Sequence, residues 1–229
     1  VLDRYQAMRV QGTGPQAAQP ASDPMAIVVE DFSIKRLQGL GRTWQDVEID
    51  ANNAAGSSAW NVAVRSRRLE GKLQLVPDMP MKIDLQRFNL PELPGIDIAG
   101  SAPAEAGAQA VSVAVQSLLA KLKPATFPAV DFSAENLAIA DVPLGRIAFA
   151  LRPAANGADI SGIRGNLRGV QLGLPEQALA LQWRQSAEAN TSVLKGPIAV
   201  ANIGDVLQSW QFERVMESRS GRADLDLHW

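Results

Sequence analysis

A tripeptide that recurs one hundred positions later constrains this chain more than any other feature of its sequence. Asp31-Phe32-Ser33 returns as Asp131-Phe132-Ser133, and the residues that follow also correspond, so that Leu37 matches Leu137. Solenoid repeats are roughly 20 to 50 residues long, and this unit is longer. We therefore expect each copy to be a small module of several β-strands.

Alternation of apolar and polar residues runs through both copies from Ile27 onwards. Residues 81–86, for example, read Met, Lys, Ile, Asp, Leu and Gln. A period of two predicts strands with one apolar and one polar face. The apolar positions that we expect to line a shared surface are Val62, Val64, Leu73, Leu75, Ile83, Leu85, Ile147, Phe149, Val170, Leu172, Leu179, Leu181, Leu225 and Leu227. A closed sandwich and a long curved sheet with an open apolar trough both satisfy this pattern.

One segment departs from the strand pattern. Residues 104–123 are rich in Ala, lack Pro, place Val and Leu at helical spacing, and are followed by Pro124. This predicts one amphipathic helix near 104–123. We therefore divide the chain into the end of a preceding element with a linker (1–26), a first β module (27–98), a Pro-rich linker plus helix (99–126) and a second β module (127–229).

The composition removes most catalytic chemistry. The chain has no cysteine and one histidine, His228, so we expect neither thiolate or multi-histidine metal sites nor histidine-based acid–base catalysis. Asp46, Glu48 and Asp50 share one face of a predicted strand, where a solvated surface explains them better than a cation site. We expect no enzyme, no cofactor and no metal. The net charge of -2 also gives no electrostatic reason to expect nucleic acid.

Arginines recur at corresponding places in the two copies. They are Arg65, Arg67 and Arg68 in the first copy and Arg164 and Arg168 in the second. One interpretation is contact with phosphate headgroups, which guanidinium groups bind well. The other is a positively charged edge that discourages strand pairing, and we favour it because it is the commoner use of such charges.

A series of short motifs follows a set order along the chain. In the second copy these are Phe132 to Leu137, Pro143-Leu144-Gly145-Arg146-Ile147, the turn at Asn156-Gly157, Leu179 to Trp183, Gly204-Asp205-Val206-Leu207 and Gly221 to Trp229. In the first copy, Trp60 to Leu75 shows a Trp-containing strand followed by a Leu-x-Gly strand. This order resembles the C-terminal part of the YhdP family, large AsmA-like proteins of Gram-negative envelopes.

The resemblance implies a bridge-like lipid transfer protein. The expected fold is mostly β, a long curved antiparallel sheet, taco-like and built from tandem modules. Its apolar groove would carry phospholipid acyl chains between the inner and outer membranes. The expected location is the periplasm, within a protein anchored in the inner membrane outside this segment, with phospholipid and other envelope proteins as partners.

The chain starts at Val1 without a methionine and ends at Trp229 directly after a strand pattern, so we expect it to be part of a longer protein. The alternative function is a structural or protein-interaction β domain of an envelope protein. In that case the helix at 104–123 or a second sheet would cover the apolar face completely.

Overall fold

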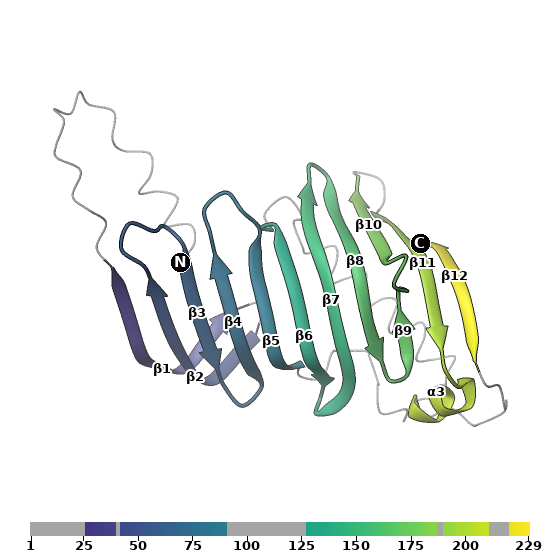
Figure 1. Cartoon of the computed structure of the whole chain (residues 1–229), viewed down its shortest axis with the longest axis horizontal. Helices are drawn as coiled ribbons and strands as arrows, with labels where there is room; N and C mark the ends of the chain where they lie inside the picture. The colour runs from purple at the N-terminus through teal and green to yellow at the C-terminus, as the bar shows by residue number, and fades with distance from the viewer. Residues whose placement is uncertain (1–25, 40–41, 91–126, 187–189, 211–219) are drawn as a thin grey trace.

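The computed structural model describes residues 26–39, 42–90, 127–186, 190–210 and 220–229, which form a mostly β fold (Figure 1). The strands from the first copy are β1 (Ile27–Gly39), β2 (Arg42–Asn53), β3 (Trp60–Arg65), β4 (Leu69–Leu75) and β5 (Met81–Leu90). Those from the second copy are β6 (Val130–Ile139), β7 (Val142–Ala154), β8 (Gly157–Leu167), β9 (Val170–Leu172), β10 (Leu179–Gln185), β11 (Asn190–Val200) and β12 (Gly221–His228). The described helix is α3 (Ile203–Ser209). The helix predicted at 104–123 and the segments 1–25 and 91–126 lie outside the described residues.

All twelve strands belong to one sheet, which Figure 1 shows as strands lying side by side from β1 to β12. The strand order is β1-β2-β3-β4-β5-β6-β7-β8-β10-β11-β12, and the short β9 pairs with both β8 and β11. The predicted long sheet is thus confirmed, and within the described residues it does not close into a barrel. The division into two modules stays a prediction, because both copies contribute to the same sheet.

One strand pair differs from the antiparallel arrangement expected. Strands β5 and β6 run parallel, with Met81 opposite Val130 and Leu90 opposite Ile139. The sheet is therefore mixed. Parallel neighbours need a connection of about a dozen residues or more, and the chain between Leu90 and Val130 is long enough to return to the starting end.

The tandem repeat is preserved in the strand pairing. Phe32 lies opposite Ile49, and Phe132 lies opposite Phe149. Both pairs occur between the first two strands of their copy, at positions that differ by one hundred on each strand. The repeated tripeptide therefore marks a repeated register.

The β1–β2 hairpin is bent, and the part of β2 around Trp44 lies across the apolar face of the sheet. Asp31 and Asp46 both have a positive φ, 55° and 50°, a conformation that aspartate tolerates better than most residues. Beyond Asp46, the ring of Trp44 stacks on Phe88 of β5 with centroids 6.4 Å apart. Three strand spacings would separate β2 from β5 by about 14 Å in a flat sheet. The β1–β2 hairpin must therefore curl inwards, and Figure 1 shows its lower part passing behind β3 and β4.

The core of this sheet is thin. The buried hydrophobic residues among those described are Val47, Val64, Leu85, Ala134, Leu144, Ala158, Ile163, Leu179 and Trp183. They are spread over β2 to β10, and the large apolar side chains of the first strand, such as Phe32 at 53% exposure, remain open. Apart from the curled part of the β1–β2 hairpin, the described residues supply no second layer over this face (Figure 1).

Ion pairs between neighbouring strands lie on the opposite, polar face of the sheet. Arg152 of β7 contacts Asp131 of β6 at 2.5 Å, and Arg184 of β10 contacts Asp159 of β8 at the same distance. Both pairs are partly exposed, so each stabilises the sheet by about 1 kcal/mol or less. They identify the polar face of the sheet.

Helix α3 lies at the end of β8 and β9. Asn202 caps it by accepting a hydrogen bond from the backbone N–H of Asp205 at 3.3 Å, as N-cap residues commonly do. The Ser209 hydroxyl donates to the carbonyl of Arg168 at 2.8 Å, and the Arg168 guanidinium lies 5.3 Å from the centre of the Trp210 ring. The helix therefore fixes the β8–β9 turn and the arginine at its centre.

Candidate functional site

The predicted groove positions share one face of the sheet, because directly paired residues on neighbouring strands point to the same side. One row crosses the sheet through Val62, Leu73, Ile83, Phe132 and Phe149. The pairing thus brings together residues from both copies. Three members of this row belong to the first copy and two to the second, so the β5–β6 junction does not interrupt the apolar surface.

A second row runs beside the first. It passes through Val64, Gly71, Leu85, Ala134 and Ile147 and continues to Leu172 of β9 through Gly165. Large and small residues alternate along it. A Cβ atom built on Gly71 would lie 2.7 Å from Cδ2 of Leu85, so the leucine occupies the space that a larger residue would need.

The remaining predicted positions extend the same face towards β12. Leu181 lies opposite Leu194, which in turn lies opposite Leu227. Leu179 pairs with Ile163 and is buried. Leu75 lies opposite Trp60. Val170 lies opposite both Leu167 and Val200, and Leu225 lies opposite Gly196. The structure therefore assembles the predicted positions on one surface, while lipid contact at each of them stays a prediction.

Aromatic rings that the alternation did not single out lie in the middle of this face. Phe88 packs edge-on against Phe132 with centroids 5.9 Å apart, and Phe132 stacks on Phe149 at 4.9 Å. Trp44 completes the row through its contact with Phe88. One signal did point to Phe132, because it is the central residue of the repeated tripeptide. Nothing in the sequence signalled Trp44, since its position depends on the bend at Asp46.

The face ends in a cleft between the bent hairpin and the β3–β4 turn. The cleft has a volume of about 390 Å³ and is lined by Thr43–Asp46 on one side and Ser66–Arg68 on the other. Trp44 belongs both to this cleft and to the aromatic row. The cleft is therefore the place where the apolar face meets charged side chains.

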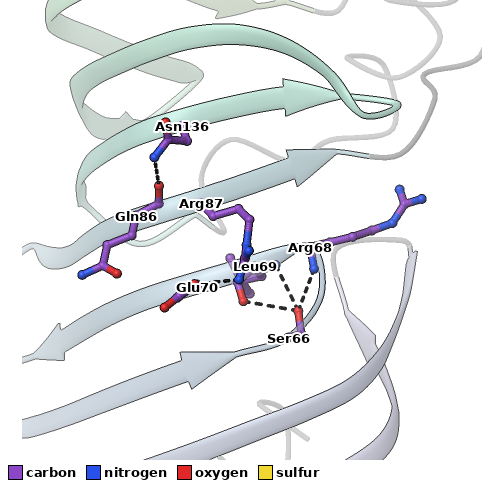
Figure 2. Close-up of polar contacts among 7 residues, drawn as sticks. All are labelled: Ser66, Arg68, Leu69, Glu70, Gln86, Arg87 and Asn136. Atoms are coloured by element: carbon purple, nitrogen blue, oxygen red, sulfur yellow. Dashed lines mark hydrogen bonds and ion pairs between the residues drawn. The ribbon is translucent and has the colours of Figure 1, made fainter.

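The polar groups of the β3–β4 turn are shown in Figure 2. Arg87 forms an ion pair with Glu70 at 2.6 Å, and the Arg68 side chain extends away from that pair. Arg65 pairs with Asp50 on the polar face. Strands β3 and β4 lie inside the sheet, each with a neighbour on both sides. The interpretation of these arginines as edge protection is therefore wrong.

Asp50, one of the three carboxylates considered as a cation site, takes part in other contacts. Asp50 accepts a hydrogen bond from the backbone N–H of Asp31 at 3.0 Å, and this bond, with the Arg65 ion pair, holds the pKa of Asp50 below its ordinary value. On β12, hydrogen bonds from His228 and Lys195 lower the pKa of Asp226 in the same way. Among the residues that the structure describes, no three potential ligands gather into a metal site.

Taken together, these features define a class of protein: a one-layer β-sheet with a continuous apolar face, suited to binding extended apolar molecules. The YhdP protein family model matches residues 6–229, and the chain belongs to this family. The family consists of envelope proteins related to lipid transport and is not a family of enzymes.

No curated protein and no solved structure matches the chain significantly. In the part of the chain that the structure describes, no helix is long and apolar enough to cross a membrane.

Proposed function

We propose that the apolar face of this sheet binds the acyl chains of phospholipids and carries them between the inner and outer membranes. The observation that supports this most is the continuity of the face across the β5–β6 junction, with exposed apolar side chains at both ends. Phe32 near the start is 53% exposed and Leu227 near the end is 48% exposed. An apolar surface of this extent is unusual on a monomer and commonly marks a binding site.

The chemistry of the face suits a cargo that slides. Apolar attraction is non-directional and contributes about 25 cal/mol for each Å² removed from water. Rows of Val, Leu, Ile and Phe offer many similar contacts, and the described residues offer no polar group inside the rows that would hold a chain at one position. Family membership supports the same proposal, because it places the protein among envelope proteins related to lipid transport.

We propose further that this segment works in the periplasm, within a protein that is anchored in the inner membrane elsewhere in its chain. Phospholipid is its cargo, and other envelope proteins are its partners at the two membranes. Cell fractionation with protease accessibility tests the location. Protection of the segment from protease after the outer membrane has been permeabilised would contradict it.

Site-specific photo-crosslinking with mass spectrometry tests the cargo. The crosslinker is placed at apolar-face positions and, as matched controls, at immediate neighbours on the polar face. The apolar positions are Leu73, Ile83, Phe149 and Leu181, and the controls are Lys72, Lys82 and Gln182. We expect phospholipid adducts at the first set and none at the second.

The rival function predicts a different result from the same experiment. If a segment of this chain or a second protein covers the face, the apolar positions will form peptide crosslinks and no lipid adducts. Equal lipid labelling on both faces would also refute the proposal, because it would indicate nonspecific detergent-like association.

A further inference from the structure

Two arginines at the β3–β4 turn stand apart from their neighbours. Arg65 and Arg87 each pair with a carboxylate. Within the described residues, the guanidinium groups of Arg67 and Arg68 have neither an ion pair nor a hydrogen bond, although both line the cleft beside Trp44. Side chains that bear a full charge and line a concave surface without a partner are candidates for binding a ligand of opposite charge.

The backbone beneath these arginines is held firmly. The Ser66 hydroxyl accepts hydrogen bonds from the backbone N–H groups of Arg68 at 3.3 Å and Leu69 at 3.0 Å (Figure 2). The carbonyl of Arg68 accepts a further bond from the N–H of Asn89 at 2.7 Å. These bonds hold the backbone of the turn in place, so the turn itself loses little entropy when the arginine side chains bind a ligand.

The second copy uses the corresponding position differently. Arg168, one hundred positions after Arg68, packs over Trp210, and its backbone is tied to α3 through Ser209. The fold itself covers that guanidinium, and its Nη1 atom is buried. In the first copy, Arg68 shares a cleft with Trp44, yet no described helix fills the space. Of the two corresponding arginines, only Arg168 is therefore covered by an aromatic ring of the described residues, while Arg68 lines an open cleft.

We propose that this cleft binds the phosphate group of an amphiphile whose acyl chain lies on the apolar face beside Trp44 and Phe88. The proposal rests on the proposed function and adds a headgroup site to it. Guanidinium groups form short, charge-assisted hydrogen bonds with phosphate oxygens. Arg67, Arg68 and Asp46 together give the lining one net positive charge, which matches a singly charged phosphodiester.

A lipid headgroup fits the cleft better than a soluble phosphate. Trp44 lines the cleft and also stacks on Phe88, so a molecule bound there contacts charge at one end and aromatic carbon at the other. Indole rings favour such boundaries between apolar and wet surroundings. Because Arg67 is exposed and Arg68 is only half-buried, added salt weakens this binding.

Calorimetry on the lipid-free chain tests the site with three probes: monomeric dihexanoyl phosphatidylglycerol, dodecyl maltoside and inorganic phosphate. The variant is R67Q/R68Q. The matched control, K82Q/R146Q, removes the same charge from two exposed residues of the polar face for which no ion pair is found among the described residues. We expect R67Q/R68Q to raise the Kd for the phospholipid roughly tenfold at low salt, because charge-assisted bonds are lost. The Kd for the maltoside should stay unchanged, and the control variant should behave like the wild type with every probe.

Each contrary outcome has a distinct meaning. Equal phospholipid affinity of the wild type and R67Q/R68Q overturns the headgroup site and leaves the apolar face as the proposed binding surface. Binding of inorganic phosphate alone, lost in R67Q/R68Q, assigns the cleft to a soluble phosphate and overturns the lipid headgroup. Failure of the wild type to bind either amphiphile refutes the proposed function itself.

Discussion

Phe32 and Phe132 occupy the same position of the repeated tripeptide, yet the structure predicts different consequences when each is replaced by alanine. Phe132 is half-buried and contacts two rings, those of Phe88 and Phe149. Phe32 is 53% exposed, and no ring contact to it is found among the described residues. A comparison based on the sequence alone would treat the two positions as equivalent.

The magnitudes follow from burial and ring contacts. Truncating a fully buried Phe costs about 3 to 5 kcal/mol, and each aromatic pair contributes about 0.5 to 1.5 kcal/mol beyond its buried area. Because Phe132 remains partly open on the apolar face, we expect Phe132→Ala to lower the free energy of unfolding by about 2 to 3 kcal/mol. Phe32→Ala should lower it by less than about 1 kcal/mol, since roughly half of its area is already in water.

Urea titration of both variants, followed by circular dichroism, measures these free energies. The protein is first stripped of bound amphiphiles, because a ligand on the apolar face would stabilise the native state and mask the difference. The ratio of the two losses is the decisive quantity. Equal losses, or a larger loss for Phe32→Ala, would refute the structural ranking of the two repeats.

Two further predictions concern strand contact and acid stability. Gly157→Ala should destabilise the protein by about 2 to 4 kcal/mol in the same titration, because the added Cβ would lie 1.9 Å from the carbonyl oxygen of Trp183. The control is Gly56→Ala, in an open turn, which should lower the free energy of unfolding by only about 1 to 2 kcal/mol. For Asp50, the hydrogen bond from the Asp31 backbone lowers the pKa in the folded state, so its stabilisation is present above about pH 4 and disappears as the pH falls through the lower folded value. Asp50→Asn should therefore lower the melting temperature relative to the wild type at pH 7, and this difference should shrink as the pH falls below about 4. A difference independent of pH would contradict this linkage.

Much of the sheet could be predicted because alternation is a local property. The run from Met81 to Gln86 predicts which residues share a face without any knowledge of the neighbouring strands, and the pairing of Ile83 with Leu73 on one side and Phe132 on the other agrees with it. The repeat added information about register, since Phe132 and Phe149 pair as Phe32 and Ile49 do.

The parts that could not be predicted depend on non-local or weakly encoded features. The parallel pairing of β5 and β6 follows from the path of a long connection, which leaves no periodic signal within the strands. The bend at Asp46 follows from a positive φ that the sequence does not mark with glycine. Without that bend, Trp44 would not reach Phe88, and the cleft beside Arg68 would not form. The sequence indicates that the arginines recur, but only the strand order shows that β3 and β4, which flank Arg67 and Arg68, lie inside the sheet.

A single layer of strands must solve a packing problem that a sandwich does not have, because no facing sheet fills the gaps between its side chains. The second row of the apolar face solves it laterally. Gly71 lies between Val64 and Leu85, and Ala134 lies between Leu85 and Ile147. Each large side chain can lean over a small neighbour on the next strand, as Leu85 does over Gly71, and such interdigitation restores contact density. Because the small residues lie on the apolar side, this packing also favours curvature towards that side, and the same alternation that stabilises the sheet shapes the surface on which an acyl chain would lie.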